Sequence, residues 1–199
     1  MRRLTIGAAA ILFVLTAALS AQTPEKKVYK EWTVNELLPS IKDLGRGHDF
    51  IQGRDLFRKT GCGVCHAFGS ESEGTGLAPD LTAVSSKMTR DAILRDILEP
   101  SATLNGQFFH TAFTLKDGTV VTGSVIDIVD KKTIILAPVM MNPQATVEIA
   151  VADVKSEAPS PISPMPGGLL NELTKEQIVQ LMAYLESGGD RHAPIYSKK

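Results

Sequence analysis

Apolar residues recur at helical spacing in several stretches of the chain. The spacing predicts helices over 49–59, 89–98 and 175–186 and a shorter helical segment over 32–44. Pro39 is expected to interrupt the segment over 32–44, because proline removes a backbone donor from a helix interior. Asp49 is placed to cap the first of the longer helices, and Thr174 with Gln177 forms a capping box for the last.

The middle of the chain changes to a β pattern. β-branched residues in partly alternating order predict strands over 109–115, 119–129, 133–139 and 146–151. Asp117-Gly118 is a strong hairpin turn between the first two strands, and Asp130-Lys131-Lys132 is a second candidate turn. The block over about 106–157 is therefore predicted to be a small antiparallel sheet or barrel, followed by a proline-rich loop over 158–168.

A leader pattern precedes these elements. Two arginines follow Met1, and an apolar run over 4–19 ends in small residues around Ser20 and Ala21. The pattern predicts a secretory signal peptide over 1–21, and hence a periplasmic or exported protein with no firm membrane anchor after cleavage. An uncleaved anchor is the alternative, although the run is near the lower length limit for a spanning helix.

Composition and net charge limit the classes of function that the chain could have. The contents of hydrophobic residues, 43%, and of charged residues, 22%, are ordinary for a globular protein. The formal net charge is −1, and removal of the leader with its two arginines would change it to −3. This near-neutral charge argues against nucleic-acid binding, which needs a basic surface.

Both cysteines of the chain lie in one motif, Cys62-Gly63-Val64-Cys65-His66. A short C-x-x-C-H segment supplies two thiols that can each bond a vinyl group of a porphyrin, and an imidazole that can ligate its iron. The motif predicts one covalently bound haem c, attached at Cys62 and Cys65, with His66 as the proximal iron ligand. Two other uses of the thiols stay open: a redox dithiol or disulfide, which expects a strand before the motif, and a zinc site, which needs further ligands.

A second axial ligand is expected from a methionine, because a thioether favours Fe(II) and raises the reduction potential. Met165 is the leading candidate, since it lies in a rigid loop of prolines and glycines with little to pack against. His110 is its main competitor. Packing roles are expected for Met140, Met141 and Met182, and a surface or packing role for Met88. The free N–H of the His66 ring also needs an acceptor, and the backbone carbonyl of Pro79, thirteen residues on, is well placed.

Several of these residues resemble the pattern of class I mono-haem cytochromes c. In that family a first helix with Gly-x-x-x-Phe/Tyr crosses a last helix that carries an aromatic residue near a leucine, and the glycine allows close approach. The chain matches the two helices with Gly53 and Phe57, and with Leu181, Tyr184 and Leu185. Pro79 and Met165 match the family's histidine-orienting proline and its Met-Pro distal loop.

His66 and Met165 are 99 residues apart, which is long for this family, and removal of the block over 106–157 leaves 47. The layout resembles the haem-binding domain of Pirellula/Verrucomicrobium type, which is typically found at the C-terminal end of larger dehydrogenase-like proteins. Further matching stretches are Ala78-Pro79-Asp80-Leu81-Thr82, Ile97-Leu98-Glu99-Pro100-Ser101 and Lys116-Asp117-Gly118. Where that family often has a tyrosine, this chain has Phe108.

The resemblance implies a fold class and a division of the chain. The implied fold is a mainly α cytochrome c domain, with its N- and C-terminal helices crossed around the haem, interrupted by a small antiparallel β insert, and α+β overall. The implied parts are a signal peptide over 1–21, an N-terminal extension over 22–46, a cytochrome c domain over 47–105 and 158–189, a β insert over 106–157 and a C-terminal tail over 190–199.

The expected function is electron transfer rather than catalysis. The chain would pass single electrons from a periplasmic dehydrogenase to a cytochrome or oxidase acceptor. One alternative is a haem enzyme or gas sensor with an open distal site, which would need an acid or base such as His48, His110 or His192. Another, compatible with the first, is that the β insert docks a partner protein.

Overall fold

The computed structural model of the protein describes residues 29–69, 74, 77–104, 106, 108–137 and 146–198. The predicted signal peptide over 1–21 lies outside these residues, as do Met140 and Met141. No helix in the described part of the chain is long and apolar enough to cross a membrane.

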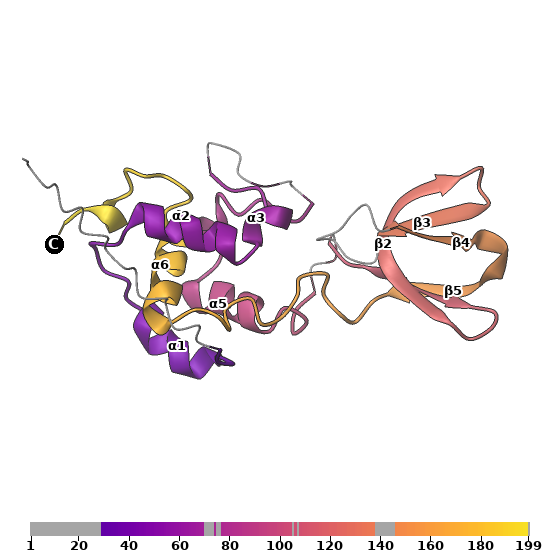
Figure 1. Cartoon of the computed structure of the whole chain (residues 1–199), viewed down its shortest axis with the longest axis horizontal. Coiled ribbons are helices and arrows are strands. Elements are labelled where there is room, and N and C mark those ends of the chain that lie inside the picture. Colours follow the sequence, from indigo (N-terminus) through magenta and orange to yellow (C-terminus); the bar gives the residue numbers. More distant parts are fainter. Residues whose placement is uncertain are drawn as a thin grey trace, which may run out of the picture.

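Helices gather at one end of the molecule and a single sheet at the other, as Figure 1 shows. The described helices are α1 (Val34–Ile41), α2 (Phe50–Lys59), α3 (Cys62–Cys65), α4 (Val84–Lys87), α5 (Arg90–Leu98) and α6 (Lys175–Glu186), with 3-10 turns over Val151–Asp153 and Pro194–Tyr196. The strands are β1 (Thr111–Leu115), β2 (Val120–Val129), β3 (Thr133–Ala137), β4 (Val147–Ala150) and β5 (Val154–Pro159). The chain thus leaves the helices after α5, forms the sheet and returns for α6.

The fold class implied by the resemblance, a mainly α cytochrome c domain, is wrong. Among the described residues 35% are helical and 20% lie in strands, and the five strands join one antiparallel sheet. Two of the described helices, α3 and α4, are single turns of four residues, and β2 is as long as α2, with ten residues each. Helices therefore do not dominate the molecule, and the site is built where its helical part meets the segments that flank the sheet.

The helices α2 and α6 pack closely at Gly53. A Cβ atom added to Gly53 would lie 2.7 Å from the Tyr184 Cβ and 2.8 Å from the Gln180 carbonyl oxygen. Phe57, one turn further along α2, is fully buried, and its ring centre lies 5.8 Å from that of Tyr184. The close approach brings the motif that follows α2 against the C-terminal helix.

Gly53→Ala is expected to lower the free energy of unfolding by about 1–3 kcal/mol, because the added methyl group must push α2 and α6 apart. The better helix propensity of alanine, about 1 kcal/mol, offsets only part of a larger steric cost. Urea denaturation followed by circular dichroism measures the change. Gly106→Ala is the control, since a Cβ there meets nothing within 4 Å. Equal stability of the two variants would contradict the packing argument.

The helix α1 begins at a capping box. The Thr33 side chain accepts from the Glu36 N–H, and the Glu36 carboxylate accepts from the Thr33 N–H at 3.0 Å. Pro39 lies inside α1 rather than interrupting it, so that expectation is wrong. Leu37 and Ile41 on the inner face are fully buried. Burial of the two side chains, about 1.5–3 kcal/mol each, offsets the cost of roughly 3 kcal/mol that a proline has inside a helix, from the lost hydrogen bond and the clash of its ring with the preceding turn.

The sheet has the strand order β4-β3-β2-β1-β5, and each described pairing is antiparallel. The predicted turn at Asp117-Gly118 is confirmed, since the Asp117 carboxylate accepts from the Thr119 N–H at 2.8 Å and Gly118 has a φ of 90°. The second predicted turn is also confirmed, because Asp130 and Lys131 both have positive φ, as the tightest hairpin turns require.

The sheet has a small core of its own, made of Phe113, Ile134 and Ile149. It rejoins the helical part at a neck, where the Ser160 N–H donates to the His110 carbonyl at 2.7 Å. Both residues are buried, and the Nε2 of His110 has no hydrogen-bond partner among the described residues. Burial therefore lowers the pKa of His110 below its usual value.

His110 is expected to make the protein less stable as pH falls below about 6.5. The unfolded chain binds a proton at this histidine before the folded chain does, so the free energy of unfolding falls until the lowered pKa of the folded state is passed. Urea unfolding over the range of about pH 5–8 measures the slope. His110→Asn should flatten it, and an unchanged slope would show that the buried imidazole is not its source.

Candidate functional site

One cavity of about 410 Å³ lies beside the motif. Its volume is within the range of roughly 300–1,000 Å³ that is typical of ligand sites. All the residues that the sequence singled out for the cofactor line it: Cys62, Cys65, His66, Pro79 and Met165. Apolar side chains of α4, α5 and α6 complete the walls. The fold thus brings together residues that precede the sheet in the sequence and residues that follow it.

The bend between α2 and α3 presents the motif to this cavity. Gly61 forms the bend with a φ of 81°, a backbone conformation that favours glycine. At the end of α3 the His66 N–H donates to the Cys62 carbonyl at 2.9 Å. A Cβ added to Gly63 would lie only 3.3 Å from the Phe57 ring, so α3 rests directly on the buried face of α2.

His66 is fixed through one nitrogen of its ring. Its Nδ1 donates to the Pro79 carbonyl at 2.7 Å, as the sequence predicts, so Nε2 keeps its lone pair. Burial lowers the pKa of His66 more than the Pro79 hydrogen bond raises it. The ring is therefore neutral, which is the form that binds a metal. The Ala78 N–H donates to the Cys65 carbonyl at 2.9 Å and ties the Pro79 segment to the motif itself.

The two cysteines are free thiols. Burial raises the pKa of both Cys62 and Cys65, which keeps them protonated at neutral pH. A redox dithiol needs the opposite, a thiol whose pKa is lowered by positive charge or by a helix N-terminus, and it expects a strand rather than α2 before the motif. The described residues also contain no group of three or more His, Cys, Asp or Glu side chains that could hold a metal ion.

Met165 reaches the cavity from the irregular segment between β5 and α6. Its N–H donates to the Ser163 hydroxyl at 3.1 Å, and the Ser163 N–H donates to the Ser101 hydroxyl at 3.1 Å. Since Ser101 follows α5, the two chain segments that flank the sheet are joined beside Met165. Sequence reasoning missed Ser163, although a serine that caps the N–H two residues on is a common turn signal.

The other candidate ligands fall in different places. Met88, expected to be a surface or packing residue, packs half-buried against the helical core, and its thioether also lines the cavity. Met182 lies in the helical core at 2% exposure, as expected. Neither His48, His110 nor His192 is among the described residues that line the cavity. An acid or base for an open distal site is therefore not supplied by these histidines.

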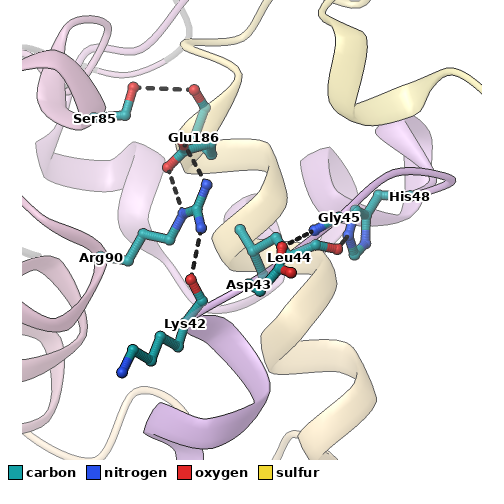
Figure 2. A network of polar contacts seen from close by, with 8 residues as sticks. All are labelled: Lys42, Asp43, Leu44, Gly45, His48, Ser85, Arg90 and Glu186. Carbon is teal, nitrogen blue, oxygen red and sulfur yellow. Dashed lines mark hydrogen bonds and ion pairs between the residues drawn. The ribbon is translucent and has the colours of Figure 1, made fainter.

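A polar network joins α4, α5, α6 and the end of α1, as Figure 2 shows. Arg90 on α5 binds both oxygens of the Glu186 carboxylate on α6, at 3.1 and 3.2 Å, and donates to the Lys42 carbonyl after α1 at 2.8 Å. The Ser85 hydroxyl on α4 donates to the Glu186 carbonyl at 3.0 Å. Because Leu185, the neighbour of Glu186, lines the cavity, these contacts brace the wall that it forms.

No protein-family model matches the chain, and no curated protein matches it either. The chemistry of the side chains nevertheless fits a covalently bound haem. Two protonated thiols, a neutral imidazole with a free Nε2 and a thioether converge on one largely apolar cavity. These are the groups that covalent attachment and two axial ligands require.

Proposed function

We propose that the protein is a c-type electron carrier that binds one haem covalently at Cys62 and Cys65. The observation that carries the proposal is the convergence of both thiols, His66 and Met165 on one cavity. In this assignment His66 is the proximal ligand and Met165 the distal ligand. When bound, the haem supplies an iron that alternates between Fe(II) and Fe(III).

Each residue has a separate task. Cys62 and Cys65 supply the sulfur atoms of two thioether bonds, so retention of the group does not depend on affinity. His66 ligates as a neutral ring because the Pro79 carbonyl holds the proton of Nδ1. The Met165 thioether stabilises the reduced state. These roles do not require any of the four residues to act as a general acid or base. We therefore propose an electron carrier rather than an enzyme.

A haem enzyme or gas sensor is the less favoured function. It would need an open distal position, whereas Met165 and Met88 both line the cavity. The proposed partners are a periplasmic dehydrogenase as electron donor and a cytochrome or oxidase as acceptor. The signal peptide predicted over 1–21 would give an exported location. Membership of the Pirellula/Verrucomicrobium-type haem-binding domains stays a prediction.

Redox titration of the mature chain, produced together with a cytochrome c maturation system, tests this function. A one-electron carrier should show a slope of about 59 mV per tenfold change in the ratio of reduced to oxidised protein, against about 30 mV for a dithiol. The reduced protein should not bind CO on mixing, because the thioether fills the sixth position. A two-electron slope would contradict haem-based transfer, and immediate CO binding would assign the site to the open-site alternative.

A further inference from the structure

We infer that Trp32 is a positioning residue for the distal ligand: together with Lys30 it clamps the chain segment that carries Met165. The inference rests on the proposed function and extends it to the residues before α1. The sequence assigned these residues only to an N-terminal extension, over 22–46, outside the haem-binding part.

The clamp consists of two hydrogen bonds to the end of the distal segment. The Trp32 indole N–H donates to the Leu173 carbonyl at 3.1 Å across 141 positions of sequence. The Lys30 backbone N–H donates to the Asn171 carbonyl at 2.9 Å. The indole also packs, partly buried, against the helical core, which shields its hydrogen bond from water.

Neighbouring charges hold the Trp32 ring in this orientation. The Lys30 ammonium lies 4.0 Å from the centre of the ring and 2.7 Å from the Glu36 carboxylate. Hydrogen bonds from Lys30 and Thr33 lower the pKa of Glu36 to about 2, so the carboxylate stays charged even in acid. Glu36 also completes the capping box of α1 with Thr33. The start of α1 thus fixes both donors of the clamp.

The clamped carbonyls belong to a packed turn over 169–173, which follows Met165 after the exposed residues 166–168. Leu170 and Leu173 are each 1% exposed in the helical core. Leu169, in the same turn, lines the cavity together with Met165. At its other end the segment is held by the Ser163 hydroxyl, which accepts from the Met165 N–H. With both ends held, Met165 stays in the cavity, and release of the clamped end allows it to leave more often.

Cyanide binding to the haem-loaded ferric protein tests the inference, because cyanide can bind only when Met165 leaves the iron. Trp32→Phe keeps an aromatic ring but removes the donor, and it should raise the binding rate roughly fivefold, as expected for one lost hydrogen bond. The long-wavelength charge-transfer band of thioether-ligated ferric haem should weaken in the same variant. Phe113→Leu is the matched control: it weakens the core of the sheet, remote from the clamp, and should leave the rate unchanged.

Amide hydrogen exchange of residues 167–173 in the same samples gives a readout that does not depend on the haem. Exchange there should be faster in Trp32→Phe and unchanged in Phe113→Leu. An unchanged cyanide rate in Trp32→Phe overturns the inference, with or without faster exchange, and so does equal acceleration in both variants. A wild type without the thioether band would instead refute ligation by Met165, which separates failure of the proposed function from failure of the clamp.

Discussion

Simultaneous replacement of both thiols, Cys62→Ala with Cys65→Ala, is expected to abolish covalent haem attachment completely. Each thioether bond needs its own sulfur, and the chain has no other cysteine. Haem staining of the denatured protein on a gel measures attachment, because only covalently held haem migrates with the chain. Each single replacement should leave one thioether and therefore a stained band.

Thr60→Ala is the control for the thiol variants. The Thr60 hydroxyl lies 3.2 Å from the Cys62 sulfur but cannot itself attach a haem, so this variant should keep its covalent haem. A stained band from the variant without cysteines would contradict the assignment of Cys62 and Cys65 as attachment sites.

Met165→Ala is expected to have the next largest effect. Attachment should be unchanged, but the long-wavelength thioether band should disappear and the reduced protein should bind CO at once. The reduction potential should fall by roughly 0.1–0.2 V, a modest part of the range of about 0.8 V over which axial ligands set haem potentials. Spectra of the oxidised and reduced protein, with a redox titration, measure all of these changes.

Met88→Ala is the matched control for Met165→Ala, since Met88 is a half-buried thioether on the wall of the same cavity. This variant should keep the thioether band and shift the potential only slightly. The opposite result, with the band lost in Met88→Ala and kept in Met165→Ala, would make Met88 the distal ligand and refute the role given to Met165.

Features that depend on a few nearby residues could be predicted from the sequence. The capping box of Thr174 and Gln177 is present at the start of α6. The hydrogen bond between His66 and Pro79, thirteen positions apart in the sequence, is also present. Such contacts depend on local turn and cap geometry, which short stretches of sequence encode.

Some features that depend on packing between distant segments could not be predicted, although the close approach of Gly53 to Tyr184 was. Met88 was expected to be a surface or packing residue, and nothing in the sequence around it indicated that its side chain would also line the cavity. Pro39 was expected to stop a helix that burial of Leu37 and Ile41 sustains.

The error in fold class has the same origin. The motifs that resemble cytochromes c predicted which residues lie around the cavity. Such short motifs carry no information about how much of the chain forms helix or sheet. The β pattern was recognised between α5 and α6, yet its weight in the whole molecule was underestimated. Short helices can contribute to the site without making the molecule mainly helical: α3 carries Cys62 and Cys65, and α4 lines the cavity.

The central claim is that one haem is held by two thioether bonds, and the intact mass of the mature protein in denaturing solvent tests it most directly. Only covalent bonds survive these conditions. The predicted result is the mass of the polypeptide plus one haem for the wild type, and of the polypeptide alone for the variant without Cys62 and Cys65. A wild-type mass equal to the polypeptide with two free thiols, or lighter by two hydrogens as in a disulfide, would contradict the claim.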